Sequence, residues 1–155
     1  MPGIDPEVIC HKLSVWVDTK PVKQKPRRMN EERSHSINDE VDHLLQAGFI
    51  REIFYPDWLS NVIFVEKKNG KWRVCIEFTN LNESCPKDSY PLLRIDQLVE
   101  VTAGHELLSF MDAYSGYNQI KMNPPDEDKT AFTTGRRIYY YKVMPFGLKN
   151  TRATI

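Results

Sequence analysis

Cysteines are few in this sequence, net charge is absent, and the apolar residues form no long run. Of 155 residues only three are cysteines, Cys10, Cys75 and Cys85, and none stands in a C-x-x-C pair. An odd set without paired spacing fits neither a disulfide framework nor a zinc site, so we expect reduced thiols in an intracellular protein. Basic and acidic residues balance at 21 each, so any contact with a nucleic acid must come from local patches.

Targeting and membrane signals are also missing. The first five residues, MPGID, lack the basic and apolar regions of a signal peptide, and no apolar run approaches the ~18 residues of a membrane span. We therefore expect no membrane contact and no secretion. What is present is an ordinary globular composition, 41% hydrophobic and 27% charged, for which one domain is the default.

A basic segment precedes the first regular pattern. Residues 20–28, KPVKQKPRR, carry five basic residues, two prolines and no acid. This composition predicts an extended, solvent-exposed arm, and a simple solvated linker is the alternative interpretation. We divide the chain accordingly into an arm, residues 1–29, and a folded unit, residues 30–155.

The folded unit begins with a helical pattern and continues with two β-hairpins. Residues 61–66 and 72–78 are rich in β-branched and aromatic side chains and predict a hairpin with a basic tip, KKNGK. Residues 130–134 and 138–143 predict a second hairpin. The helix before them has Asn30 or Ser34 as its cap and Gly48 as its end, and its apolar positions at i, i+4, i+7 and i+8 are Ile37, Val41, Leu44 and Leu45.

Between the hairpins, the pattern predicts a second helix followed by a buried strand. Pro91 suits the first turn of this helix, which ends near Gly104 and has Ile95, Leu98 and Val99 as apolar positions. Residues 106–111, ELLSFM, are a short apolar run that predicts a buried strand with Asp112 at its carboxyl end.

Two features could support chemistry. A strand holds a carboxylate such as Asp112 in place while carbonyls and water complete the oxygen shell of a divalent cation, although a strand-end aspartate is more often a turn residue or a helix cap. The hairpin tip could neutralise a triphosphate or a nucleic-acid backbone through its basic side chains, Lys67, Lys68, Lys71 and Arg73, although a solvated turn explains them too. Taken alone, Tyr117 is interpreted as a core aromatic.

The order of the motifs adds a family resemblance. KKNGKWRVCIEFTNLN, SYPLLRIDQL, LLSFMDAYSGYNQIKM, KTAFTT and YYYKVMPFGLKN follow one another. Together they resemble the reverse transcriptase of long-terminal-repeat retrotransposons of the Ty3/gypsy type, over residues 8–150. The resemblance implies an α+β, right-hand polymerase fold, with fingers strands in residues 61–78 and the start of the palm in residues 107–112. It also implies a cytoplasmic protein or one enclosed in virus-like particles.

By this resemblance, one short motif forms the catalytic centre. Asp112 matches the first catalytic aspartate, which ligates two Mg²⁺ ions, and the backbone carbonyl of Ala113 also faces metal. The amides of Ser115 and Gly116 approach the triphosphate of the incoming nucleotide. Tyr117 matches the aromatic residue that packs beneath its sugar and excludes a 2′-hydroxyl.

The resemblance places further nucleotide contacts outside that motif. Lys67 and Arg73 match fingers residues that grip the triphosphate, and Phe146 matches a palm residue beside the nascent base pair. The implied partners are an RNA or DNA template with its primer, and deoxynucleoside triphosphates. Attack of the primer 3′-oxygen on the α-phosphate builds charge on the attacking and leaving oxygens, which two metal ions stabilise together.

Other polar clusters receive structural interpretations. The four histidines lack a zinc spacing and are expected at the surface or as capping residues. The acidic run at residues 126–128 follows two prolines and predicts a solvated turn. The three tyrosines at residues 139–141 could stack on bases, or could alternate inward and outward along a strand.

The sequence departs from the family in ways that bear on activity. The family places a further aspartate pair in a Tyr-x-Asp-Asp hairpin, and these 155 residues contain none; thumb, connection and RNase H portions are missing too. Two divalent ions about 4 Å apart repel by roughly 16 kcal/mol at an effective dielectric constant near 20. We therefore expect this chain, as part of a polyprotein, to be inactive by itself; the alternatives are a nucleic-acid-binding module and a pseudogene product. Glu77 in place of the usual Asp, and Arg152 within the last five residues, are further departures.

Overall fold

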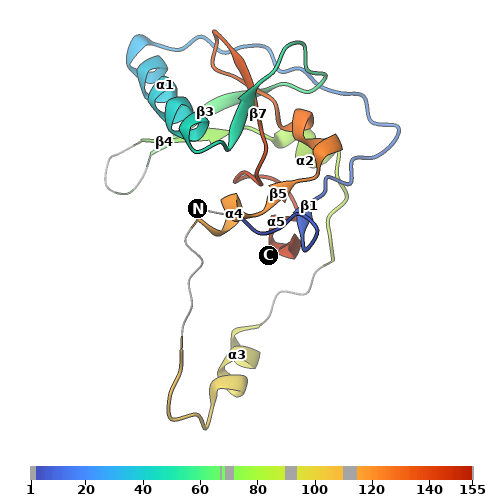
Figure 1. The fold of residues 1–155 in the computed structure, drawn as a ribbon, viewed down its shortest axis with the longest axis vertical. Helices are drawn as coiled ribbons and strands as arrows, with labels where there is room; N and C mark the ends of the chain where they lie inside the picture. The colour runs from blue at the N-terminus through green and yellow to red at the C-terminus, as the bar shows by residue number, and fades with distance from the viewer. Residues whose placement is uncertain (1–2, 67, 69–71, 90–93, 110–114, 155) are drawn as a thin grey trace.

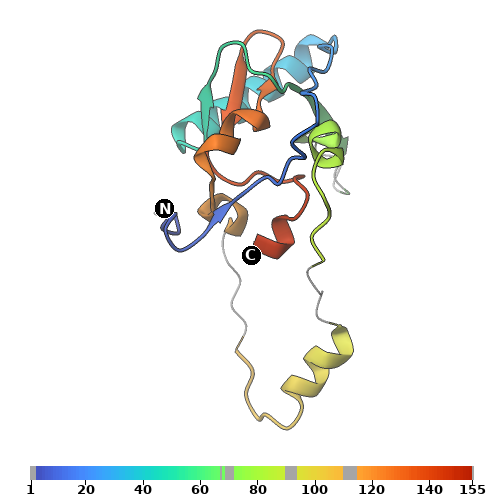
Figure 2. The same ribbon diagram turned by 90° about the vertical axis from the view of Figure 1, so that its right-hand side faces the viewer.

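The computed structural model describes residues 3–66, 68, 72–89, 94–109 and 115–154. These residues form a body of mixed helices and strands, from which one helix, α3 (Ile95–Thr102), projects (Figures 1 and 2). None of the described helices is long and apolar enough to cross a membrane.

The first long helix, α1 (Glu31–Gln46), forms as predicted. The side chain of Asn30 accepts a hydrogen bond from a first-turn backbone N–H and caps the helix. Ile37 and Val41 are buried against the sheet. The helix is followed by Gly48, whose φ of +72° lies in the left-handed region that glycine adopts without strain.

Five strands of the described chain form one sheet, in the order β2-β7-β6-β3-β4. Both predicted hairpins are confirmed, because β3 pairs antiparallel with β4 and β6 pairs antiparallel with β7. A parallel pairing between β3 and β6 joins the two hairpins. The strands are β2 (Ile50–Glu52), β3 (Ser60–Glu66), β4 (Trp72–Ile76), β6 (Phe132–Thr133) and β7 (Ile138–Tyr141).

Aromatic residues of the second hairpin pack together in the core. The ring centroid of Phe132 lies 6.0 Å from that of Tyr139 and 5.4 Å from that of Tyr141. Burial raises the pKa of Tyr141, as expected for a phenol in the interior. The structure therefore supports the alternating-strand interpretation for residues 139–141.

A smaller group of elements lies beside the sheet. Strand β1 (Cys10–His11) pairs in parallel with β5 (Lys121–Met122). Close to the chain start, the backbone N–H of Ile4 donates to the carbonyl of Gln119 at 2.8 Å. The other elements of this group are α2 (Thr79–Glu83), α4 (Gly116–Gln119), the 3-10 helix η1 (Pro124–Thr130) and α5 (Thr151–Thr154).

Residues 20–28 of the basic arm are extended and largely exposed, as predicted, but they are hydrogen-bonded to the sheet. Gln24 makes two of these bonds: its side-chain oxygen accepts from the backbone N–H of Asn61 at 2.8 Å, and its amide donates to the carbonyl of Glu77 at 3.1 Å. Lys23 forms a bridge with Leu59. The division of the chain at residue 29 stays a prediction.

The predicted buried strand is wrong for residues 106–109, which form no strand and are exposed. The side chain of Leu107 is 91% exposed. A strand needs a hydrogen-bonded neighbour and an apolar face to cover, and within the described part of the chain these residues have neither. Helix α3 is confirmed from Ile95 onward, but its apolar side chains are also exposed; Pro91 and residues 110–111 lie outside the described residues.

Candidate functional site

Two residues predicted to contact a nucleotide lie against each other. The ring centroids of Tyr117 and Phe146 are 4.3 Å apart, with an angle of 40° between the planes. Tyr117 is half-buried on α4, whereas Phe146 is 63% exposed in the turn after β7. Backbone hydrogen bonds of 2.8 and 2.9 Å between residues 120–122 and 142–144 bring the two segments together. The structure thus forms an open aromatic pair from separate motifs.

The residues before Tyr117 make a tight backbone turn. Ser115 has a φ of +50° and ψ of +41°, the left-handed conformation that residues with a Cβ rarely adopt. Its carbonyl accepts from the backbone N–H of Asn118 at 2.9 Å. Ser115 is exposed and Gly116 half-buried, so both backbones lie at the surface next to the aromatic pair. Such backbone strain persists where the surroundings fix the conformation, and it is common at functional sites.

The turn that carries Phe146 is anchored by Asn82 of α2, a residue that the sequence interpretation did not single out. The Asn82 amide donates to the carbonyl of Gly147 at 2.7 Å, and its oxygen accepts from the backbone N–H of Lys149 at 2.7 Å. The Lys149 ammonium in turn donates to the carbonyl of Cys85 at 2.6 Å. Asn82 therefore fixes the position of Phe146 through the backbone, and its only signal in the sequence was its place in the first resemblance motif.

Of the other predicted site residues, Arg73 is described, and it is not joined to this pair. Arg73 is exposed on β4 opposite Val65, and among the described residues no hydrogen bond, ion pair or ring contact links it to Tyr117 or Phe146. Lys67, Asp112 and Ala113 lie outside the described residues, so their roles stay predictions. Within the described ranges, no group of three or more His, Cys, Asp and Glu side chains could hold a metal ion.

His11 corrects the expectation that the histidines lie at the surface. It is 1% exposed, because β1 pairs with β5 in the interior. Its Nδ1 lies 2.8 Å from the hydroxyl of Thr154 on α5, and its Nε2 has no hydrogen-bond partner among the described residues. Burial lowers the pKa of His11, and the nearby Asp126 carboxylate opposes this only in part. The imidazole is therefore neutral and links the amino-terminal segment to α5.

Asp126 corrects the expectation of a solvated acidic turn. Its side chain is buried in η1, where it accepts from the backbone N–H of Leu13 and the amide of Asn123, both at 3.0 Å, and pairs with Lys129. Burial by itself would raise the pKa of this carboxyl, but the hydrogen bonds from Lys129, Asn123 and Leu13 together lower it. Only Asp128 of the acidic run is fully exposed.

Comparison with known proteins decides the family. The family model described as reverse transcriptase (RNA-dependent DNA polymerase) matches residues 65–154. The chain belongs to the reverse transcriptase family. The chain is 33% identical to the transposon Tf2-3 polyprotein of Schizosaccharomyces pombe over 121 residues, and 34% identical to the Tf2-7 polyprotein of the same organism over 116 residues. These matches cover 78% and 75% of this chain, but 9% of each polyprotein.

Solved structures confirm the predicted polymerase fold. The native foamy virus protease-reverse transcriptase superposes with a TM-score of 0.74 at 22% identity, over 91% of this chain and 19% of that one. A foamy viral protease-reverse transcriptase solved in complex with double-stranded DNA gives a TM-score of 0.71 at 17% identity, over 99% and 26%. The chain is thus a reverse transcriptase domain of a retrotransposon polyprotein of the Ty3/gypsy type, in a family that generally uses divalent metals.

Proposed function

We propose that this chain forms the nucleotide-binding part of an RNA-directed DNA polymerase, which extends a primer on an RNA or DNA template with deoxynucleoside triphosphates. The observation that supports it best is the contact between Tyr117 and Phe146. The resemblance assigns both rings to the nucleotide, and they lie 4.3 Å apart although they come from separate motifs.

The chain's own residues have distinct tasks in this proposal. The half-buried ring of Tyr117 packs beneath the incoming sugar and excludes a 2′-hydroxyl by steric contact, and Phe146 holds that ring from one side. The amides of Ser115 and Gly116 approach the triphosphate. Arg73 and Lys67 neutralise its negative charge, which a guanidinium does with two parallel hydrogen bonds.

Asp112 and the carbonyl of Ala113 would hold magnesium in this proposal. Two bound Mg²⁺ ions would stabilise the charge that builds on the attacking and leaving oxygens of the phosphoryl transfer. Carboxylate and carbonyl oxygens suit Mg²⁺, which keeps several waters and binds through one or two carboxylates plus substrate phosphates. Asp112 alone offsets little of the repulsion between two divalent ions, so further carboxylates must come from elsewhere in the polyprotein. The isolated 155-residue chain therefore binds a nucleotide with one metal ion and does not turn it over.

Binding of a fluorescent deoxynucleoside triphosphate in the presence of Mg²⁺ tests the site. Phe146→Ala should weaken binding about tenfold, in line with ~1–3 kcal/mol for stacking on an aromatic ring. Tyr140→Ala is the matched control, because Tyr140 is half-buried on β7, outside the site, and should leave binding unchanged. Equal effects of the two substitutions would refute the assignment.

A primer-extension assay tests the catalytic part separately. The isolated chain should show no synthesis with Mg²⁺ and deoxynucleoside triphosphates. Robust synthesis that Asp112→Asn abolishes would show that these residues suffice for catalysis, and would overturn the proposed dependence on further carboxylates.

A further inference from the structure

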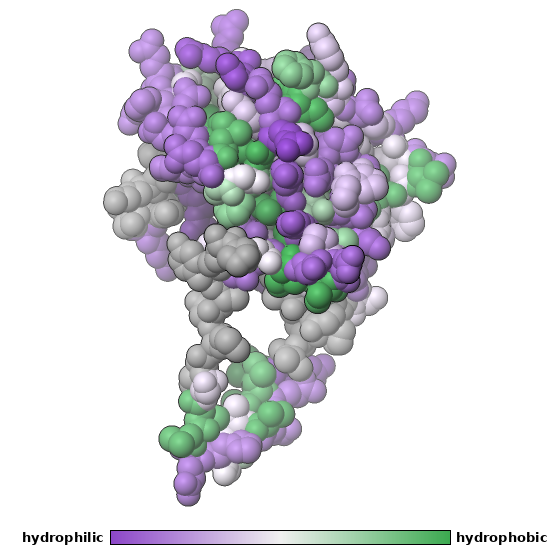
Figure 3. All heavy atoms as spheres, in the orientation of Figure 1, coloured by the Kyte–Doolittle hydropathy of each residue, from purple (hydrophilic) through white to green (hydrophobic). Residues whose placement is uncertain are grey.

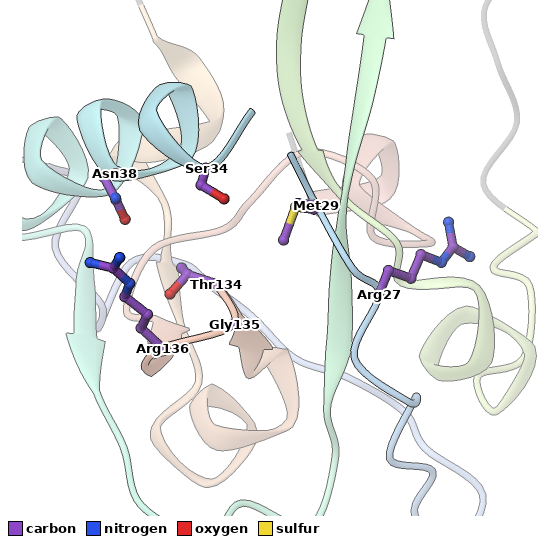
Figure 4. Close-up of a pocket in the computed structure, with 7 residues that line it drawn as sticks. All are labelled: Arg27, Met29, Ser34, Asn38, Thr134, Gly135 and Arg136. Carbon is purple, nitrogen blue, oxygen red and sulfur yellow. The ribbon is translucent and has the colours of Figure 1, made fainter. Parts of the chain in front are cut away.

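A pocket that includes neither ring of the aromatic pair opens between residues 27–29 of the basic arm, α1 and the turn that joins β6 to β7 (Figure 4). Figure 1 shows how these elements are arranged. Its volume is about 200 Å³. The family resemblance assigns no role to its residues. The pocket is lined by Arg27, Met29, Ser34, Asn38, Thr134, Gly135 and Arg136.

Two arginines, Arg27 and Arg136, line this pocket, and Arg137 follows in the same turn; Arg27 and Arg137 each form an ion pair. Arg27 pairs with Glu77 at 2.7 Å, and its side chain points away from the other lining residues (Figure 4). Arg137, the next residue in the turn, pairs with Glu52 at 3.2 Å. Arg136 forms no ion pair or hydrogen bond with any other described residue, and it extends toward α1. The pocket therefore holds one guanidinium whose charge has no direct partner among the described residues.

The polar groups around Arg136 are arranged for an acceptor-rich ligand. The Ser34 hydroxyl already donates to the carbonyl of Asn30 at 3.0 Å, and the Thr134 hydroxyl interacts with the backbone of Arg137. The Asn38 side chain has no hydrogen bond within the described part of the chain, and the Arg136 guanidinium points toward it (Figure 4). The Arg136 guanidinium and the Asn38 amide thus face one space, and their N–H groups suit an anion with several oxygens once the amide turns its NH2 toward it.

Charged residues around the pocket both favour and oppose the binding of an anion. Residues 19–29 and 129–142, which form two of the walls, contain no acid. On the third wall, Glu31 lies three positions before Ser34, so it shares a helix face with it, although it does not line the pocket. Glu31 therefore opposes an anion, and its removal should favour one.

We propose that this pocket binds a phosphodiester group of a nucleic-acid strand, held by Arg136 and Asn38. A continuous strand fits better than a free anion because the exposed residues 20–28 run from the pocket and carry four further basic side chains without a direct acidic partner among the described residues. Such a strand would follow the arm with successive phosphates, as backbone contacts do in non-specific binding. The site is independent of the Tyr117–Phe146 pair.

The decisive experiment compares two neighbouring arginines. Binding of a fluorescein-labelled single-stranded oligonucleotide to the whole chain is measured by anisotropy without Mg²⁺, at several salt concentrations. Arg136→Gln should weaken binding about threefold or more and reduce the salt slope by about 0.7, the value for one lost phosphate contact on a single strand. Arg137→Gln removes the same formal charge outside the pocket. It should change log Kd by less than half of the change that Arg136→Gln causes.

Substitutions of one neutral residue, Asn38, and one acidic residue, Glu31, extend the test. Asn38→Ala keeps the charge and should still weaken binding, whereas Glu31→Gln should strengthen it. Circular dichroism confirms that each variant is folded, which is expected because all four side chains are exposed. Equal losses for the two arginines, or no loss for Arg136→Gln, would show a diffuse electrostatic effect and overturn the pocket.

A titration with inorganic phosphate distinguishes a site for a nucleic-acid strand from a site for a free anion. Phosphate is titrated into the chain while the amide signals of Thr134 and Gly135 are followed by NMR. The proposal expects no saturation by phosphate below about 10 mM, since a single ion gains none of the arm contacts. Saturation at lower concentration, lost in Arg136→Gln, would identify a free-anion site and refute the nucleic-acid assignment.

Discussion

The body and the projecting segment, residues 94–109, have similar patterns of apolar residues, but these residues are buried in the body and exposed in the projecting segment. In α1 of the body, Ile37 is 1% exposed, whereas Ile95 at the start of α3 is 78% exposed. Figure 3 shows apolar side chains on the surface of the projection, where no described element covers them. Apolar periodicity thus indicates which face of a helix needs cover, but the covering surface has to come from elsewhere.

The difference has an energetic meaning. Burial of a large aliphatic side chain contributes about 1.5–3 kcal/mol, and the body gains this from each core residue. The projection gains little, because Leu98, Val99, Val101 and Leu107 are all at least 48% exposed. Local opening of α3 therefore costs far less than unfolding of the sheet.

A matched pair of isoleucine substitutions tests this contrast most strongly. Ile37→Ala should lower the free energy of unfolding by about 2–5 kcal/mol, because it leaves a cavity in the core. Ile95→Ala, on the exposed helix, should change it by less than about 0.5 kcal/mol. Urea unfolding followed by circular dichroism measures both. Similar losses would mean that α3 is covered in solution.

The anchor at Asn82 should give the next largest effect. Asn82→Ala removes both side-chain hydrogen bonds to the turn after Phe146, and should cost about 1–3 kcal/mol. Asn38→Ala serves as the control, since Asn38 is exposed and should cost less than about 0.5 kcal/mol. Equal costs for the two asparagines would contradict the assigned role of Asn82.

A smaller effect concerns pH. Because the pKa of buried His11 lies below its value of 6.5 in the unfolded chain, protons bind the unfolded state first as pH falls. The contribution of neutral His11 to the free energy of unfolding should be present above pH 6.5 and should be lost as the pH falls below that value. His11→Asn can keep a hydrogen bond to Thr154 without titrating, so it should flatten this decline in urea unfolding measured from pH 7.5 to 5. An unchanged slope in that variant would assign the decline to other groups.

The smallest effect is expected at the tip of the projection. Leu107→Ser should alter the free energy of unfolding by less than about 0.5 kcal/mol, because that side chain is 91% exposed. It should also reduce self-association, measured by light scattering at rising concentration, since exposed apolar patches promote it. A loss of stability above 1 kcal/mol would show that Leu107 packs against the body.

The elements that the sequence predicted well are those with local signals. Helix α1 has its cap, its apolar spacing and its terminal glycine within one stretch, and each hairpin has its strands close together. His11 and Asp126 were misjudged because their burial depends on the pairing of β1 with β5, which lie more than 100 residues apart in the chain. The strand at residues 106–109 was misjudged because strand formation requires a partner that no local pattern can supply.

The candidate site was predictable to a similar degree. Motif order placed Tyr117 and Phe146 in one site, and the structure brings their rings together. Asn82 was missed because its role is to hold a distant backbone turn, which residue type alone does not indicate. That Arg136 has no acidic partner among the described residues could not be predicted either, since it depends on where Glu52 and Glu77 lie.

The parallel pairing of β3 with β6 has a consequence for folding kinetics. Each hairpin can form within microseconds, but their junction must close a long loop that includes the projection. Loop-closure entropy grows only logarithmically, so that doubling the loop costs about 0.6 kcal/mol. The connection between the hairpins can therefore lengthen or shorten considerably while the sheet keeps nearly the same stability, and a longer connection should mainly slow folding.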